Sequence, residues 1–215
     1  MLRDEGYSLT LASRRAERVE AAAEELGAVA IAADVGDADA CARLVAEHRE
    51  RFGRLDMLVN SAGIGVAGRV EDLPAKHFDL QVGINLRGLF LVTQAAVPLL
   101  RESRGWIVNL ASIAGTLPTP GLATYGATKA AVISLTRSLN EELDADGVRA
   151  VAICPGFVDT PMAQWSGLTS DEMIKPDDCA EVVRMLLRLS PRARIPQVVI
   201  ERSGSVNGDV PLSGA

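Results

Sequence analysis

Three residues whose types and spacing could support proton transfer occur close together in the sequence: Ser112, Tyr125 and Lys129. Residues four apart lie on one face of a helix, so the Lys129 ammonium can sit beside the Tyr125 phenol. The ordinary pKa of a phenol, about 10, is too high for acid–base work at neutral pH. A fixed neighbouring cation lowers the pKa of a phenol. We therefore expect Lys129 to bring the pKa of Tyr125 toward neutrality and make it a proton donor and acceptor.

The alternative is a chance pair on a helix surface. The 215 residues include two tyrosines and three lysines, so a Tyr-x-x-x-Lys spacing is expected by chance roughly 0.03 times. Chance is therefore a poor explanation of the pair.

Length and composition bound the class of protein. A chain of 215 residues fits one domain with a large core, and 48% hydrophobic and 23% charged residues are ordinary values for a globular protein. The net charge of -6 and the lack of any basic run argue against a nucleic-acid partner.

Cysteine usage and the apolar runs predict a cytoplasmic location without membrane insertion. Cys41, Cys154 and Cys179 have no metal-ligand spacing and no even pairing, which favours a reducing compartment and gives no metal site. The N-terminus is charged, unlike a signal peptide. The longest apolar stretch, residues 89–100, is too short to span a bilayer.

Short apolar runs alternate with helical patterns along the chain. We predict strands at residues 7–12, 29–33, 55–60, 106–111, 148–154 and 197–201. We predict helices from a cap at Ser13 to 26, and at residues 37–52, 74–101, 125–143 and 176–189, with stops at Gly27 and Gly53. This alternation predicts an α/β fold with a doubly wound, three-layered parallel sheet in a single domain. Residues 203–215 form a Gly- and Ser-rich tail that we expect to be loose.

Polar and glycine residues cluster where the predicted strands end. They are Ser13, Arg14 and Arg15 after the first strand, Asp34 after the second, residues 60–63 at the third, Ser112 after the fourth and Pro155 with Gly156 after the fifth. Ligands of such sheets bind beyond the carboxyl ends of the strands. The chemistry is therefore predicted at one edge of the sheet, where Tyr125 and Lys129 open the next helix.

With these residues in that order, the chain resembles the short-chain dehydrogenase/reductase family over nearly its whole length. Asn60-Ser61-Ala62-Gly63 is similar to the family's Asn-Asn-Ala-Gly turn, with serine at the second position. Asn85-Leu86-Arg87-Gly88 is similar to its Asn-Val-x-Gly motif. Pro155-Gly156 and Thr160 match the segment that closes over the nicotinamide end of the cofactor.

The resemblance implies a Rossmann-type domain that interconverts a carbonyl and a secondary alcohol with NAD(P)(H). Tyr125 would be the general acid in reduction and the base in oxidation. Ser112 would donate a hydrogen bond to the substrate oxygen, and Lys129 would tune Tyr125 and hold the nicotinamide ribose. Asn85 would hold a water in a proton relay to the lysine, or else simply hydrogen-bond within its helix.

The resemblance also implies a set of cofactor contacts: Ser13, Arg14, Arg15, Asp34, Val35, Asn60, Ala62, Gly63, Tyr125, Lys129, Pro155, Gly156, Val158 and Thr160. An acidic residue after the strand that reads the adenosine ribose would favour NAD. Ser13, Arg14 and Arg15 stand there instead, so NADP(H) is favoured over NAD(H). Arg14 and Arg15 could also be solvated helix-start residues, and Asp34 could be a helix cap.

One family feature is missing. The family begins with a strand and a glycine-rich loop that holds the pyrophosphate at a helix N-terminus, and no such segment precedes Tyr7. Residues 63–68 fit G-x-G-x-x-G, but they follow the Asn-Ser-Ala-Gly turn and open no helix. In the family's strand order the missing strand is central, and buried unpaired groups on its neighbours cost about 1–3 kcal/mol each. We hypothesise that the sequence is truncated relative to the functional protein, for example by a start codon placed too late.

One alternative function stays open, and another is disfavoured. A non-catalytic chain that keeps the fold and acts through self-association or a protein partner would explain the missing loop. A nucleotide-sugar epimerase shares Tyr-x-x-x-Lys but needs a substantial C-terminal substrate domain, which this chain lacks.

The substrate is predicted to be a small carbonyl or alcohol. Residues 157–176 should form part of its lid, and their apolar members suggest an apolar substrate or a lid that packs on its own domain. The resemblance implies a homodimer or homotetramer formed through the Asn85 and Tyr125 helices.

Overall fold

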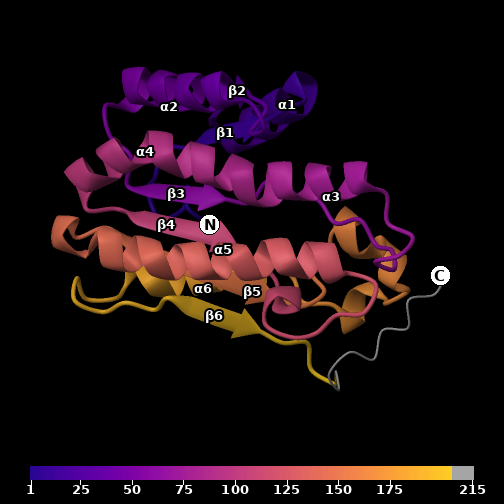
Figure 1. The fold of residues 1–215 in the computed structure, drawn as a ribbon. Helices are drawn as coiled ribbons and strands as arrows, with labels where there is room; N and C mark the ends of the chain where they lie inside the picture. The colour runs from indigo at the N-terminus through magenta and orange to yellow at the C-terminus, as the bar shows by residue number, and fades with distance from the viewer. Residues whose placement is uncertain (205–215) are drawn as a thin grey trace.

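A computed structural model describes residues 1–204, in which helices and parallel strands alternate (Figure 1). The strands are β1 Thr10–Ser13, β2 Val29–Ala32, β3 Met57–Asn60, β4 Trp106–Leu110, β5 Arg149–Pro155 and β6 Gln197–Ile200. The α-helices are α1 Ala16–Leu26, α2 Ala38–Phe52, α3 Ala75–Val82, α4 Leu89–Ser103, α5 Ala123–Glu142 and α6 Pro176–Leu187. The predicted α/β fold with parallel strands in a single domain is confirmed. The expected loose tail falls almost wholly outside the described residues.

Successive side chains of the central strands point to opposite faces of the sheet, and a layer of helices covers each face. On one side, Ile107 of β4 and Ala150 of β5 pack with residues of α4 and α5. On the other side, Val108 and Val151 pack with α6. Parallel strands covered on both faces read as continuous apolar runs. The sheet is therefore the middle of three layers, with α4 and α5 in front and α6 behind in Figure 1.

The strands form two separate sheets. The larger has the order β3-β4-β5-β6, and β1 pairs with β2 alone. Within residues 1–204, no strand lies between β1 and β3, which is where the sequence predicts that a central strand is missing. Apart from this gap between β1 and β3, the order of the strands is that of a doubly wound sheet.

A cavity of about 1040 Å³ lies at the split. Residues 5–13 of the β1 segment and 54–62 of the β3 segment line it, together with Val19, Leu44 and Val92 from the covering helices. The strand edges that border it hold N–H and C=O groups that a sheet would otherwise pair.

His48 of α2 links the two sheets. Its Nε2 lies 2.9 Å from the Arg54 carbonyl oxygen, and its Nδ1 lies 2.8 Å from Thr10 Oγ1. Because a carbonyl oxygen can only accept, Nε2 donates to Arg54. Thr10 is in β1, and Arg54 precedes β3, so the first residues of both strands lie at the same end of the molecule.

Local signals set the bounds of most helices. Asp37 caps α2 by accepting from the N–H groups of Asp39 and Ala40, and Gly53 ends that helix with φ 71°. Gly27 ends α1 with φ 61°, as expected. The predicted cap at Ser13 is wrong, since α1 begins at Ala16 with Arg15 in the capping position. Ser13 instead belongs to β1.

The predicted helix over residues 74–101 is interrupted. α3 passes through a turn of π-helix at Gly83–Gly88 into α4, and Asn85 lies within that turn. By length and composition alone, Ala75–Ser103 could cross a membrane, which residues 89–100 could not. Its side chains Val92, Ala96 and Leu100 are buried in this domain, as in a core helix.

Candidate active site

Ser112, Tyr125 and Lys129 come together at the carboxyl end of β4. Ser112 follows β4, is 9% exposed, and accepts a hydrogen bond of 3.2 Å from the Ala114 N–H. Tyr125 and Lys129 lie on the first turns of α5, and Lys129 is 5% exposed. Its Nζ lies 5.6 Å from the centroid of the Tyr125 ring. The three side chains therefore lie together, as the sequence predicts.

Two glycines allow this approach. A Cβ at Gly126 would lie 2.7 Å from the Ala114 carbonyl oxygen, and one at Gly115 would lie 2.7 Å from the carbonyl carbon of Lys129. Both distances are far below van der Waals contact. The turn after Ser112 can therefore press against α5 only because neither position has a side chain.

The pKa of Tyr125 does not shift in the expected direction. Burial raises the pKa of the Tyr125 phenol, and a hydrogen bond with the Ser112 side chain opposes that rise. Desolvation penalises the phenolate, and in this site it outweighs the hydrogen bond. The prediction that Lys129 brings this pKa toward neutrality is therefore wrong for the protein alone.

Burial also penalises the charged form of Lys129. Burial lowers the pKa of its ammonium to about 8. Its Nζ donates a hydrogen bond of 2.6 Å to the Leu110 carbonyl oxygen. Because an ammonium carries three N–H donors, this contact fixes the side chain and uses one of them. Burial also raises the pKa of the nearby Cys154 thiol to about 11, so this cysteine stays protonated at neutral pH.

Asn85 organises the loop after β3. Its Oδ1 accepts from the Ile64 N–H at 2.8 Å, and its Nδ2 donates to the Ile64 carbonyl oxygen at 2.8 Å and to Thr128 Oγ1 at 3.1 Å. A Cβ at Gly63 would lie 3.4 Å from Asn85 Oδ1 and 3.5 Å from Lys129 Nζ. The side chain therefore joins the loop to α5, while the water-relay role stays a prediction.

A second cavity, of about 340 Å³, lies beyond the ends of β1, β2 and β3. Seven predicted cofactor residues line it: Ser13, Arg14, Arg15, Asp34, Val35, Ala62 and Gly63. Asp34 Oδ1 accepts from the Gly36 N–H at 2.8 Å, which orders this turn rather than capping α2. Arg18, Ser61 and Ile64 also line the cavity and were missed. Arg18 could have been found because it lies three residues after Arg15, on the same face of α1.

Other predicted residues lie away from this cavity. The Asn60 side chain is buried and donates to Thr93 Oγ1 at 3.0 Å and to Asn109 Oδ1 at 2.9 Å, so it ties β3 to the core. Pro155 is the last residue of β5, and Gly156, Val158 and Thr160 follow it. Their contact with a cofactor, like that of Asn60, stays a prediction.

The larger cavity is not the catalytic centre. Ser112, Tyr125 and Lys129 line neither cavity, and the 1040 Å³ space lies between the two sheets. Chemistry therefore locates the site better than cavity size does. Gly65, also missed, lies against the Tyr125 ring, since its Cβ would be 3.6 Å from Cδ2.

Comparison with protein-family models and curated proteins gives a consistent match. A sequence profile described as short chain dehydrogenase matches residues 1–170. An uncharacterized oxidoreductase of Staphylococcus epidermidis is 35% identical over 205 residues, which cover 93% of this chain and 88% of the relative.

Solved structures give the same result. An alcohol dehydrogenase from the archaeon Thermococcus sibiricus, complexed with 5-hydroxy-NADP, has a TM-score of 0.86 and 31% identity, covering 94% of this chain and 88% of that one. The 3-ketoacyl-(acyl-carrier-protein) reductase of Brucella melitensis, complexed with NADH, has a TM-score of 0.84 and 30% identity, covering 93% and 87%.

Proposed function

Because the chain belongs to the short-chain dehydrogenase family, we propose that it transfers a hydride between NADP(H) and a carbonyl compound or secondary alcohol. The family makes it an NAD(P)-dependent oxidoreductase. The observation that carries the finer proposal is the grouping of Ser112, Tyr125 and Lys129 at the end of β4, with Ser112 and Lys129 buried and Tyr125 partly exposed.

Each side chain has a distinct task. The Tyr125 hydroxyl gives a proton to the substrate oxygen in reduction and takes it back in oxidation. The Ser112 hydroxyl, already hydrogen-bonded to Tyr125, donates to the same oxygen as negative charge develops there. When bound cofactor and substrate exclude water from the site, the Lys129 ammonium attracts the Tyr125 phenolate more strongly. It then opposes the rise of the Tyr125 pKa. The bound nicotinamide supplies or accepts the hydride.

The arginines support NADP(H) over NAD(H). Arg14, Arg15 and Arg18 line the 340 Å³ cavity beyond β1. Guanidinium groups match phosphate geometry, so they suit the 2′-phosphate that distinguishes NADP. The relatives with bound cofactor differ, since one carries 5-hydroxy-NADP and another NADH. The preference therefore rests on this chain's own residues.

The substrate and the assembly are part of the proposal. Apolar residues of the segment after β5, including Met162 and Trp165, favour an apolar carbonyl substrate. Phe90 of α4 is 45% exposed in the single chain, which suits burial in a homodimer or homotetramer through α4 and α5.

Binding and turnover test the proposed function. NADPH fluorescence should change on mixing with the protein, and a panel of ketones should be reduced with a lower KM for NADPH than for NADH. Tyr125→Phe should lower kcat by about 10²-fold or more with an unchanged circular dichroism spectrum, because the proton donor is lost. A fully active Tyr125→Phe variant would refute the assigned role. Failure to bind either cofactor would favour a non-catalytic chain.

A further inference from the structure

Residues 157–175 leave the sheet after β5 and return at the start of α6; we call them the substrate loop. They lie at the edge toward which β3 and β6 point in Figure 1. The loop starts beside the candidate site, because Cys154 at the end of β5 hydrogen-bonds with the main chain of Ser112. Two short 3-10 turns, Pro161–Ser166 and Ser170–Glu172, lie within the loop.

Main-chain contacts close the base of the loop. Val158 and Ile174 form an isolated parallel bridge. The Asp159 N–H donates to the Ile174 carbonyl oxygen at 2.8 Å, and the Ile174 N–H donates to the Phe157 carbonyl oxygen at 3.0 Å. Ile174 is 7% exposed, so its side chain anchors this base in the core. The first residues of the loop, 157–159, and its last residues, 174–175, therefore lie side by side, and we call them its first and second stems.

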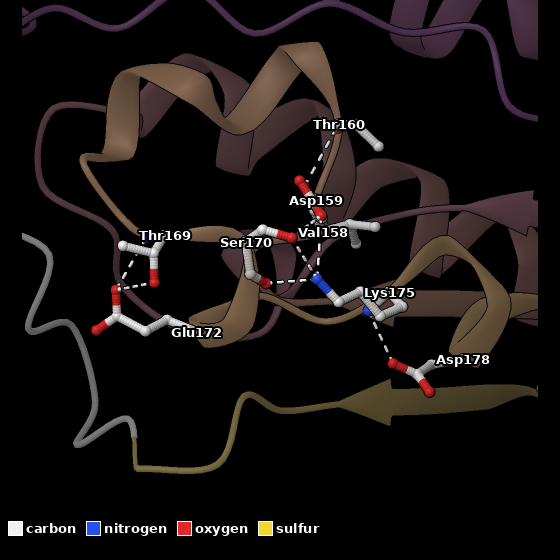
Figure 2. A network of polar contacts seen from close by, with 8 residues as sticks. All are labelled: Val158, Asp159, Thr160, Thr169, Ser170, Glu172, Lys175 and Asp178. Carbon is white, nitrogen blue, oxygen red and sulfur yellow. Dashed lines mark hydrogen bonds and ion pairs between the residues drawn. The ribbon is translucent and has the colours of Figure 1, made fainter.

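Three side chains form a closed set of polar contacts above that base (Figure 2). Lys175 Nζ donates to Asp159 Oδ2 at 3.1 Å, to Ser170 Oγ at 2.6 Å and to the Ser170 carbonyl oxygen at 2.6 Å. Ser170 Oγ donates to Asp159 Oδ2 at 2.5 Å. All three donors of the ammonium are thus used. We call Asp159, Ser170 and Lys175 the latch.

The latch joins three parts of the chain. Asp159 belongs to the first stem, Ser170 to the second 3-10 turn, and Lys175 precedes α6. The Lys175 N–H also donates to Asp178 Oδ2 at 2.8 Å. α6 is held in the core by Leu186, which is fully buried. The second turn of the loop is therefore tied to Asp159, after β5, and to Lys175, the residue before α6.

The contribution of the latch is local. The side chains of Lys175 and Asp159 are 43% and 37% exposed, and solvent screens an ion pair of this kind, so it adds little to global stability. Hydrogen bonds from Ser170 and then Lys175 hold the pKa of Asp159 below its usual value. The carboxylate is therefore charged at neutral pH, and the latch is closed there.

Between the stems, the first 3-10 turn presents apolar side chains. Met162 is 47% exposed and Trp165 is 44% exposed. The Trp165 ring packs edge-on against Phe157, with 5.7 Å between the ring centroids. Ala163 and Ser166 of the same turn are buried. The turn therefore has one side in the protein and one apolar side exposed.

We propose that Asp159, Ser170 and Lys175 are positioning residues that hold the substrate loop as a preformed wall, whose Met162 and Trp165 side chains contact an apolar substrate. The substrate contact rests on the proposed function, whereas the ordering of the loop does not. A loop fixed before binding loses less conformational entropy when the substrate arrives. The latch therefore acts on substrate affinity, through the fraction of molecules with the loop in place.

Amide hydrogen exchange tests the ordering without requiring turnover. In Lys175→Met, amides of residues 160–173 should exchange at least about threefold faster, while those of α6 stay unchanged, because only the loop loses its tie. Lys76→Met, at an exposed lysine of α3, is the matched control and should leave the loop unchanged. Unchanged loop exchange in Lys175→Met overturns the proposal. Equal acceleration in α6 also overturns it, because Lys175 would then be a general stability residue.

Steady-state reduction of acetophenone by NADPH tests the substrate contact. Lys175→Met should raise the KM for acetophenone about 3- to 10-fold and change kcat less than about twofold, because the competent fraction falls while Tyr125 is untouched. Lys175→Arg should restore part of the KM, and Met162→Ala should raise it. A lower kcat at an unchanged KM would contradict a positioning role. If the unaltered protein binds no NADPH, the proposed function fails, while the exchange result still decides the role of the latch.

Discussion

Lys129 is a cation that the fold buries at a cost. Its side chain is 5% exposed, and burial lowers the pKa of its ammonium from 10.5 to about 8. This difference corresponds to roughly 3 kcal/mol of lost stability when the group is charged. A buried charge without a compensating carboxylate is unusual in a core and typical of a functional site.

The buried ammonium predicts a pH dependence of stability. Between pH 8 and pH 10 the unfolded chain retains a proton that folded Lys129 has lost, so the free energy of unfolding should rise with pH. Below pH 8 both states are protonated, and the burial penalty is present in full. Lys129→Met should therefore be the more stable protein at pH 7, and its advantage should shrink toward pH 10. Urea unfolding at several pH values measures this, and a constant difference between the two proteins would contradict it.

Tyr125 shows the limit of pairwise reasoning at this scale. The i,i+4 spacing places Lys129 near the ring, yet burial raises the pKa of the phenol. Spacing predicts which groups meet, while the solvent accessibility of the whole site decides the net shift. The hydrogen bond with Ser112 lowers the pKa of the phenol, which is the direction that catalysis needs.

At the scale of elements, close packing of the turn after Ser112 against α5 builds the site. Gly126 faces the Ala114 carbonyl oxygen, and Gly115 faces the main chain of Lys129. A side chain at either position would force the two elements apart. Ser112 and Tyr125 would then separate, because each is carried by one of them.

Glycine substitutions test this packing. Gly126→Ala should destabilise the protein by about 1–3 kcal/mol and lower kcat, since its Cβ would lie 2.7 Å from a main-chain oxygen. Gly83→Ala is the matched control: that residue has φ -58° and open space around its Cβ, so it should be neutral or stabilise by about 0.5–1 kcal/mol. Urea unfolding and steady-state kinetics give both quantities. Similar effects of the two substitutions would show that helix propensity, and not contact, matters.

At the scale of the whole molecule, the described chain has two sheets of unequal support. β4 and β5 are paired on both sides, whereas β1 pairs with β2 only and β3 with β4 only. The 1040 Å³ cavity lies between β1 and β3. Protection from exchange follows pairing and burial, so it should be highest in β4 and β5.

We expect His48 to stabilise the two-stranded β1-β2 sheet against local opening. Its two hydrogen bonds join β1 to the residues before β3. Loss of both in His48→Ala should cost about 1–2 kcal/mol, which makes opening of residues 10–32 roughly 5- to 30-fold more frequent. Amide exchange should show this acceleration in β1 and β2 and not in β4 and β5, with His77→Ala as the control. Equal acceleration in all four strands would mean that the two sheets unfold as one unit.

Prediction from sequence worked where a signal is local. α2 follows from the Asp37 cap and the Gly53 stop, both of which the structure confirms. It failed where pairing decides: residues 7–9 have strand character, but β1 begins at Thr10 because its four residues are the ones in register with Val29–Ala32. The π-helical turn at Gly83–Gly88 had no signal in the periodicity, since one added residue in a turn barely alters an apolar face.

The sequence by itself determined the family, the alternation of strands and helices, and the grouping of Ser112, Tyr125 and Lys129, because these depend on residue types at fixed spacing. Only the tertiary structure decided the direction in which the Tyr125 pKa shifts, the burial of the Asn60 side chain and the polar contacts that hold the substrate loop. Each of these depends on burial and on contacts between residues distant in sequence. Spacing along the chain specifies neighbours on one element, whereas desolvation and packing are set by all the elements that surround a group.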